Sequence, residues 1–175
     1  FHSLKIRKNE IDVIQKDYDY FDNFEKSFIL TIKDKLNEMI RTNPASYVIS
    51  ECLKSFDYKN CNHLHKALEE NLLRLINDNK SVNIIKTLMT LSLTNKMIKK
   101  MITKCLKENF AAIAMNKSGH YILISYFEEI SQEELNSYSD IIIKNIDFFL
   151  YKSFSYKVVR KFTKLLVRFF FILGK

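Results

Sequence analysis

The chain has 175 residues, a formal net charge of +8 and a hydrophobic content of 47%. With only two glycines and one proline it lacks the turn residues that hairpins need, so the composition favours helices. The apolar content excludes a wholly disordered chain, and the positive charge favours an anionic partner such as RNA, DNA or a membrane surface.

Cysteine content and terminal sequence bear on the cellular setting. Cys52, Cys61 and Cys105 are an odd number without paired spacing, which favours a reducing cytosolic or nuclear compartment. Residues 1–10 are charged and lack the apolar run of a signal peptide. Since the chain begins with Phe1 instead of Met, we expect it to be part of a longer product. No apolar run reaches the roughly 20 residues that a membrane span needs, so we expect no membrane partner.

Taken in chain order, the pattern predicts an all-α fold of two-helix repeats. Residues 1–27 are predicted to form a degenerate N-terminal repeat, and residues 28–175 to form about four repeats with a period of about 37. Pro44 fits the first turn of a helix, where its missing N–H costs nothing. Ser131-Gln132-Glu133-Glu134 is predicted to be an N-terminal cap followed by first-turn acids. The predicted helices cover residues 28–41, 45–56, 65–76, 81–92, 96–115, 120–130, 140–150 and 156–173.

The repeat is clearest in the second helix of each pair. Asn79-Lys80-Ser81 returns as Asn116-Lys117-Ser118, 37 positions later, and similar apolar residues follow each copy. Spacing of i, i+4 and i+8 places three side chains on one helical face, which the neighbouring repeats must cover. The predicted trios are Val48, Cys52 and Phe56; Ile85, Met89 and Leu93; Ile122, Tyr126 and Ile130; and Val158, Phe162 and Leu166.

Three segments, residues 43–53, 118–123 and 156–161, resemble the second helix of a Pumilio (PUF) repeat. The resemblance implies a right-handed α-solenoid of Pumilio or armadillo-like repeats whose second helices line a concave RNA-binding face. In that family one residue of each second helix stacks between bases, and the residues just before it and three after it contact a base edge. The positions that this implies here are Ser46, Tyr47 and Ser50; Asn83, Ile84 and Thr87; His120, Tyr121 and Ile124; and Tyr156, Lys157 and Arg160.

The last position of each trio departs from the family. PUF proteins usually place Gln or Glu there, whereas these four trios have Ser50, Thr87, Ile124 and Arg160. Only Gln15 conforms, in an N-terminal copy that would consist of Ile11, Asp12 and Gln15. Ile124 cannot hydrogen-bond a base, so we expect no literal sequence code. The pattern is more similar to the divergent nucleolar Puf-A-like branch, whose members bind RNA with little sequence preference and are associated with ribosome assembly. The resemblance therefore implies ribosomal RNA or a pre-ribosome as partner, in the nucleolus, the nucleus or the ribosome-associated cytoplasm.

The residue types also favour RNA without the family. Aromatic rings on the predicted second helices can stack on bases, at about 1–3 kcal/mol per base, and cations beside them can neutralise phosphates. These residues are Tyr47, His120, Tyr121 and Tyr156, and Lys86, Lys157, Arg160 and Lys161. Each ring has the alternative role of packing against the adjacent repeat. A second interpretation is an armadillo or HEAT-type scaffold whose groove binds a protein or peptide, because fold alone does not decide function.

Nothing in the sequence indicates catalysis, so we predict no enzyme, no catalytic residue and no cofactor. Phosphate-binding glycine loops and nucleophile or zinc-protease motifs are absent. The pairs Glu69-Glu70, Glu128-Glu129 and Glu133-Glu134 are adjacent residues, whose side chains diverge on a helix. Cys61, His63 and His65 are metal-ligand types, but their spacing matches no zinc pattern, so no metal site is predicted.

Two further features have alternative interpretations. Lys99, Lys100, Lys104 and Lys107 on one predicted helix either contact phosphates or keep a convex surface helix soluble. The apolar residues 169–172 are either core, an interface to a further repeat, or an exposed patch that binds a protein partner at the C-terminal end.

Overall fold

The computed structural model describes residues 19–20, 22–32, 34–36, 38–39, 42–56 and 61–173, and only the backbone at 62, 63 and 171–173. Within these ranges every regular element is a helix, which confirms the predicted all-α class. The residues described between 19 and 39 are helical and precede the first labelled helix. Residues 1–18 of the predicted N-terminal repeat lie outside the described residues, so that repeat stays a prediction.

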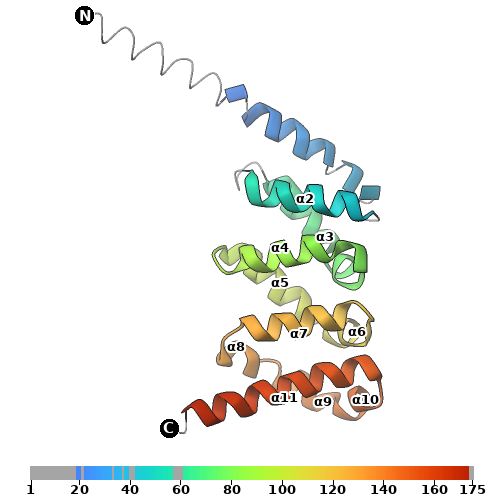
Figure 1. The fold of residues 1–175 in the computed structure, drawn as a ribbon, viewed down its shortest axis with the longest axis vertical. Helices are drawn as coiled ribbons and strands as arrows, with labels where there is room; N and C mark the ends of the chain where they lie inside the picture. Colours follow the sequence, from blue (N-terminus) through green and yellow to red (C-terminus); the bar gives the residue numbers. More distant parts are fainter. Residues whose placement is uncertain are drawn as a thin grey trace, which may run out of the picture.

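The helices stack along the long axis of the molecule (Figure 1). Four of them, α2, α4, α7 and α11, lie one beneath the other and form what we call the front layer, while the other helices form a rear layer. The elements are α2 (Asn43–Ser55), α3 (Asn62–Asn77), the 3-10 turn η1 (Asn79–Ser81), α4 (Val82–Ser92), α5 (Lys96–Glu108), α6 (Phe110–Met115), α7 (Gly119–Glu129), α8 (Gln132–Asn136), α9 (Ser139–Lys144), α10 (Ile146–Leu150) and α11 (Ser153–Leu173).

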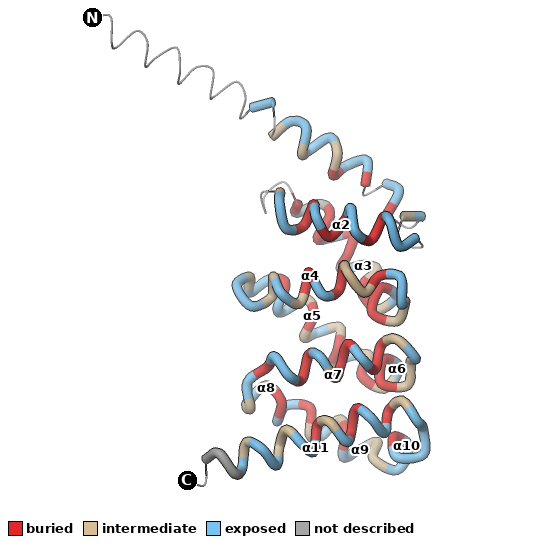
Figure 2. The backbone as a smooth tube through the Cα atoms, in the orientation of Figure 1, coloured by how far each residue is buried: buried red, intermediate tan, exposed pale blue. Residues whose placement is uncertain are grey.

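One apolar core runs through the stack from Ile29 to Phe162. In the front layer α2 packs against α4 and α7 against α11, while α3 of the rear layer packs against both α4 and α5. Buried segments alternate with exposed ones along each helix, because each helix turns one face to its neighbours (Figure 2). In this arrangement neighbouring helices cover each other's apolar faces.

Burial defines the register of the front layer. Each front helix has a residue of 0% exposure at its start and a second, apolar residue of 0% exposure three positions later. Ser46 to Ser81 is 35 positions, Ser81 to His120 is 39, and His120 to Ser155 is 35, so the spacing of these buried residues is less even than the predicted period of about 37. The four buried pairs are Ser46 and Ile49, Ser81 and Ile84, His120 and Leu123, and Ser155 and Val158.

Two members of the predicted apolar trios were wrong. Val48 is exposed, since the buried face of α2 is centred on its neighbour Ile49. Leu93 is also exposed, because α4 ends at Ser92 and Leu93 belongs to the turn that follows. Among the remaining members, Cys52 and Ile85 are representative of those that join the core.

Two predicted long helices are each divided by an asparagine. Residues 96–115 form α5 and α6 with Asn109 between them, and residues 140–150 form parts of α9 and α10 with Asn145 between them. The side-chain amides donate to carbonyls four residues earlier, at 3.0 Å for Asn109 and 2.8 Å for Asn145, and so compete with the backbone N–H groups. Asn71 makes the same bond, to the Ala67 carbonyl at 2.9 Å, inside the continuous helix α3.

Gly119 marks a close approach of α7 to α3 and α6. A Cβ atom at this position would lie 2.5 Å from Asn77 Oδ1 and 2.8 Å from the carbonyl oxygen of Ile113. Both distances are too short for non-bonded atoms, so a residue with a side chain would push α7 away from α3 and α6. The absence of a side chain therefore fixes where the next residue, His120, enters the core.

Two helix starts were predicted correctly. Pro44 lies in the first turn of α2. Ser131 is the N-cap of α8, and its hydroxyl accepts from the backbone N–H of Glu134 at 3.2 Å, with acidic Glu133 and Glu134 in the first turn.

Candidate nucleic-acid interface

The residues predicted to contact RNA divide into buried and exposed groups. Ser46 and His120 have no exposed surface, and neither has Ile84, which the family pattern would place between bases. The reason is that these three positions belong to the buried pairs of the front layer, so their side chains point between helices. The predicted residues with the most exposed surface are instead Tyr47, Lys86, Tyr121, Tyr156, Lys157 and Arg160.

One groove between α2 and α4 brings together several predicted residues. It has a volume of about 420 Å³, and Tyr47, with 61% of its surface exposed, forms part of its wall. Ser50 and Thr87 are almost fully buried and contribute to its floor. The residues lining this α2–α4 groove are Tyr47, Ser50, Glu51, Lys54, Asn83, Lys86, Thr87, Thr90 and Leu91.

A second set of predicted residues meets where α7 packs against α11. The His120 ring centroid lies 3.8 Å from that of Tyr121 and 5.0 Å from that of Phe154. The Lys157 ammonium lies 5.7 Å from the Tyr121 ring and 5.9 Å from the Phe154 ring, within the range of cation–π attraction. Tyr121 and Tyr156 keep 57% and 45% of their surfaces exposed. The exposed Tyr121 ring and the Lys157 ammonium therefore lie close together where α7 meets α11.

His120 is the fully buried ring of this cluster. Its Nδ1 lies 3.0 Å from the Asn116 carbonyl oxygen, while its Nε2 is buried without a hydrogen-bond partner. Burial lowers the pKa of His120, and the positive charge of Lys157 acts in the same direction, against the hydrogen bond to Asn116, which favours the protonated form. The neutral ring, donating from Nδ1, is therefore the form that fits this site.

The α11 helix carries a line of positive charge. Its basic residues recur every three or four positions and so lie along one side of the helix, and Ser153–Leu173 contains no acidic residue. We call this set the basic stripe. Two of its members, Lys164 and Arg168, were not among the predicted RNA-binding residues, although they follow Arg160 at helical spacing. The basic stripe consists of Lys157, Arg160, Lys161, Lys164 and Arg168.

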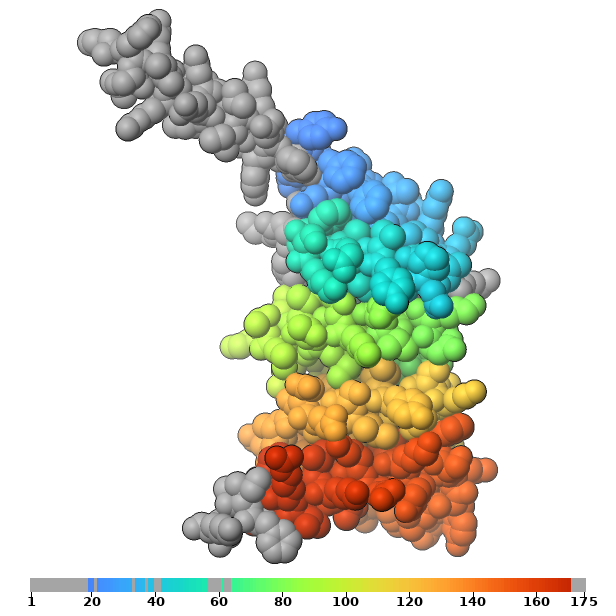
Figure 3. All heavy atoms as spheres, in the orientation of Figure 1, coloured from blue at the N-terminus to red at the C-terminus, as the bar shows by residue number. Residues whose placement is uncertain are grey.

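Charge is not uniform over the front layer. The groove between α4 and α7, of about 430 Å³, has Glu128 and Glu129 on its α7 side and Lys86 on its α4 side. Glu128 also forms an ion pair with Lys161 of the basic stripe. The front helices appear as successive bands on one face of the molecule (Figure 3), so this acidic pair separates the α2–α4 groove from the basic stripe.

The C-terminal end of α11 is partly apolar and exposed. Phe170 is exposed and Phe169 is half-buried against the core, while the side chains of residues 171–173 are outside the described ones. A protein partner at this end stays a prediction.

The described part of the chain holds neither a metal-binding cluster nor a membrane-spanning helix. Among the described side chains, no group of three or more His, Cys, Asp or Glu residues is placed to hold a metal ion; the His63 side chain is not among them. None of the described helices combines the length and the apolarity that crossing a bilayer demands.

The candidate interface consists of the basic stripe, the rings where α7 meets α11, and the α2–α4 groove. The Pumilio resemblance stays a prediction: a scan against protein-family models gives no match, and a comparison with curated proteins gives none either.

Proposed function

We propose that this chain is a right-handed, Pumilio-like α-solenoid that binds single-stranded RNA on its front layer, without catalysis and with little sequence preference. The observation that carries the proposal is the basic stripe of α11 beside the exposed rings of Tyr121 and Tyr156. Cations at helical spacing next to exposed aromatic rings are the combination by which proteins hold single strands.

Phosphates and bases have separate places in this mechanism. The phosphates lie along the basic stripe, where Arg160, Lys164 and Arg168 are exposed. Bases stack on Tyr156 and on Tyr121, whose ring is oriented by the buried His120. Such contacts carry little sequence information.

The α2–α4 groove provides a second, weaker contact. Tyr47 offers a ring, and Lys54 and Lys86 offer positive charge, but Glu51 lies on the same wall. Its polar floor consists of Ser50 and Thr87, whose hydroxyls are almost fully buried. A base bound here is held mainly by stacking on Tyr47, which is consistent with the low sequence preference of the proposal.

The biological setting of the proposal follows from the resemblance to the Puf-A-like branch. The partner is ribosomal RNA or a pre-ribosome, and the location is the nucleolus, the nucleus or ribosome-associated cytoplasm. An unstructured RNA and a ribosomal RNA fragment should then bind with similar affinity, since neither is read by sequence.

The direct test replaces two members of the basic stripe by acids. Lys157→Glu/Arg160→Glu should weaken binding of a labelled oligouridine of about 12 nucleotides by at least about tenfold, measured by fluorescence anisotropy. Because two phosphate contacts are lost, the slope of log K against log salt should become less steep by about 1.4.

A matched control removes the same charge elsewhere. Lys35→Glu/Lys144→Glu changes two exposed lysines that belong neither to the basic stripe nor to the front grooves. It should alter RNA affinity far less than the stripe variant. Equal weakening by both pairs would show that only net charge matters and would refute the interface.

A scaffold function of the armadillo or HEAT type is the second candidate. The α4–α7 groove favours it, because apolar Met89 and Leu93 lie there with Glu128 and Glu129, a lining that suits a basic peptide. A labelled Lys- and Leu-rich peptide titrated against the protein tests this function. Binding that Glu129→Lys abolishes, together with no binding of oligouridine, would favour the scaffold over the RNA-binding protein.

A further inference from the structure

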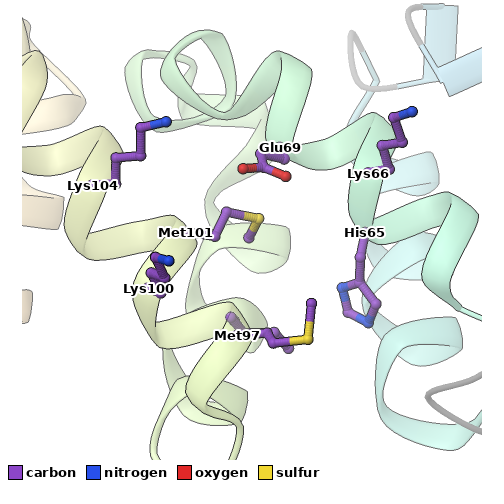
Figure 4. A pocket seen from close by; sticks show the side chains of 8 residues that line it. His65, Lys66, Glu69, Met97, Lys100, Met101 and Lys104 are labelled. Carbon is purple, nitrogen blue, oxygen red and sulfur yellow. The ribbon is translucent and has the colours of Figure 1, made fainter.

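The rear layer contains a groove that the proposed RNA interface does not use. It lies between α3 and α5, has a volume of about 550 Å³ and is open to solvent along one side (Figure 4). A cavity of this size accommodates one or two amino-acid side chains with their backbone. The groove is bounded by side chains of both helices, so an occupant would contact two successive repeats.

Positive charge surrounds this α3–α5 groove. Lys66 of α3 lies on one side, and Lys100 and Lys104 of α5 lie on the other. All three lysines are exposed, so their ammonium groups can reach carboxylates of a partner without being desolvated. Lys100 and Lys104 are one helical turn apart and present their charges in a row.

The space between the lysines is apolar. Met97 of α5 has 67% of its surface exposed, and Met101, one turn further along, is half-buried against the core (Figure 4). Methionine side chains are flexible and polarizable, and they adapt to aliphatic side chains of a partner. Among the described lining residues the only aromatic ring is that of His65, which is 8% exposed and offers little surface to a nucleobase; the lining has no Phe, Tyr or Trp. The lining therefore favours a peptide over a nucleic acid.

We propose that the α3–α5 groove binds an acidic protein segment, which inserts an aliphatic side chain between Met97 and Met101 while its carboxylates pair with Lys66, Lys100 and Lys104. Charge complementarity selects an acidic partner and fixes its orientation, and the methionine contact supplies the apolar burial. The protein then has two interaction faces, with RNA on the front layer and an acidic protein on the rear layer.

Glu69 tunes this site. Its carboxylate lies among the same lining residues, on α3 beside Met101 and Lys104 (Figure 4). As a negative charge within the groove lining, it repels the carboxylates of an acidic partner. Glu69→Gln should therefore strengthen peptide binding, whereas removal of a carboxylate from a solvent-exposed face without function would change nothing.

The test uses two labelled peptides of about a dozen residues that differ only in their apolar anchors. The first is rich in Glu and Asp with two central leucines one helical turn apart, and the second has serine in place of both leucines. The whole chain should bind the leucine peptide at least about tenfold more tightly than the serine peptide in fluorescence anisotropy. Lys100→Glu/Lys104→Glu and Met97→Ser should each weaken binding of the leucine peptide by at least about fivefold.

Controls separate this proposal from the RNA proposal. Lys157→Glu/Arg160→Glu should leave peptide affinity unchanged, and excess oligouridine should not displace the peptide. Circular dichroism identifies any variant that has lost its helices. Met97→Ser changes an exposed position, so of these variants it is the one least expected to disturb folding. Equal binding of both peptides, displacement by oligouridine, or no peptide binding by the wild-type chain would each overturn the proposal, whatever the outcome for RNA.

Discussion

The helices α5 and α11 carry the same number of basic residues but present them in different surroundings. The five of α5 are Lys96, Lys99, Lys100, Lys104 and Lys107, and the five of α11 form the basic stripe. The lysines of α5 lie among methionines on one side and beside Glu133 and Glu134 on the other. On α11, Lys157 lies beside the rings of Tyr121 and Phe154, and Lys161 pairs with Glu128. Equal charge therefore does not imply an equal partner, because the neighbouring groups decide which polyanion gains additional contacts.

The two helices are also held in place by different interactions. A polar network secures α5: the Lys99 ammonium lies 2.9 Å from Glu134 of α8, and the Tyr126 hydroxyl of α7 donates to the same carboxylate at 2.5 Å. The Thr103 hydroxyl lies 2.7 Å from that of Tyr126. Burial pushes the pKa of Glu134 upward, but the hydrogen bonds and the charge of Lys99 outweigh burial and hold this pKa below its usual value.

Aromatic rings and other apolar side chains hold α11 in place. His120 and Phe154 stack with centroids 5.0 Å apart, and α11 also buries Val158 and Phe162 against the core. Such contacts are apolar and tolerate changes of salt, whereas the α5 network depends on one ionised carboxylate. The ligand contacts of each helix and the contacts that hold it in the fold can therefore be altered separately on α5 and α11.

The largest effect is expected from removing the rings beside the basic stripe. Tyr121→Ala/Tyr156→Ala should weaken binding of oligouridine by about 2 kcal/mol or more, since stacking contributes about 1–3 kcal/mol per base. The salt dependence should stay that of the wild type, because no cation is lost. Tyr121→Phe/Tyr156→Phe keeps the rings and should retain the affinity. A flatter salt slope in the alanine variant would mean that the rings act only by positioning Lys157.

The next largest effect concerns the anchoring of α5. Glu134→Ala removes the carboxylate shared by Lys99, Tyr126 and Thr103, and should lower the free energy of unfolding by about 2 kcal/mol in urea titrations. Glu133→Ala, at an exposed neighbour in the same first turn, should cost only about 0.5 kcal/mol. Similar losses for both variants would show that helix-dipole effects, and not the network, account for the change.

A smaller loss is expected at Gly119, which positions α7 between the two basic helices. Gly119→Ala should destabilise the fold by about 1–2 kcal/mol, as overpacking usually does. Adding Asn77→Ala should restore only part of this loss, because the Ile113 carbonyl still lies within 2.8 Å of the new Cβ. Full recovery in the double variant would place the whole strain on the Asn77 side chain.

The smallest expected effect is a loss of stability in acid. The contacts of His120 at α11 and the Glu134 network at α5 should weaken in different pH ranges. The pKa of His120 is lowered by burial, so the unfolded chain takes up the proton first as pH falls below about 6.5, and stability decreases there. The pKa of His65 is lowered by burial as well and contributes in the same sense. For Glu134, whose pKa is lowered, stability is lost only below about 4.5.

The measurement for this prediction is urea unfolding at a series of pH values. His120→Gln should reduce the loss of stability between about pH 7 and about pH 5 without abolishing it, because His65 remains. Glu134→Gln should leave that range unchanged and flatten the curve below pH 4.5. A His120→Gln variant with the full wild-type slope would show that this ring does not resist protonation.

Sequence reasoning predicted the fold better than the interface. Apolar spacing and the near absence of glycine and proline identified the helices, and Ser131 identified a cap, since these signals are local. The divisions at Asn109 and Asn145 were missed because asparagine within an apolar pattern is a weak local signal: Asn71 makes the same bond to the preceding turn, yet α3 stays continuous. Ile84 was assigned to RNA contact because repeats of unequal length were aligned at constant spacing.

Errors in the predicted site residues came from this alignment more than from the chemistry of the residues. A shift of one position on a helix rotates a side chain by roughly 100°, enough to exchange a buried place for an exposed one. Tyr47, Tyr121 and Tyr156 lie at equivalent places, each directly after a fully buried residue, and they remain exposed. Lys164 and Arg168 could have been found from helical spacing alone, because α11 continues well beyond the family-like segment.

The bonds of Asn71, Asn109 and Asn145 offer a way to recognise this architecture in other chains. Each asparagine precedes the fully buried residue that starts the next front helix, by ten positions for Ser81, eleven for His120 and ten for Ser155. An aliphatic residue then follows three positions later. A search profile built on this asparagine, a gap of nine or ten residues, and the buried pair would tolerate insertions that defeat a fixed period.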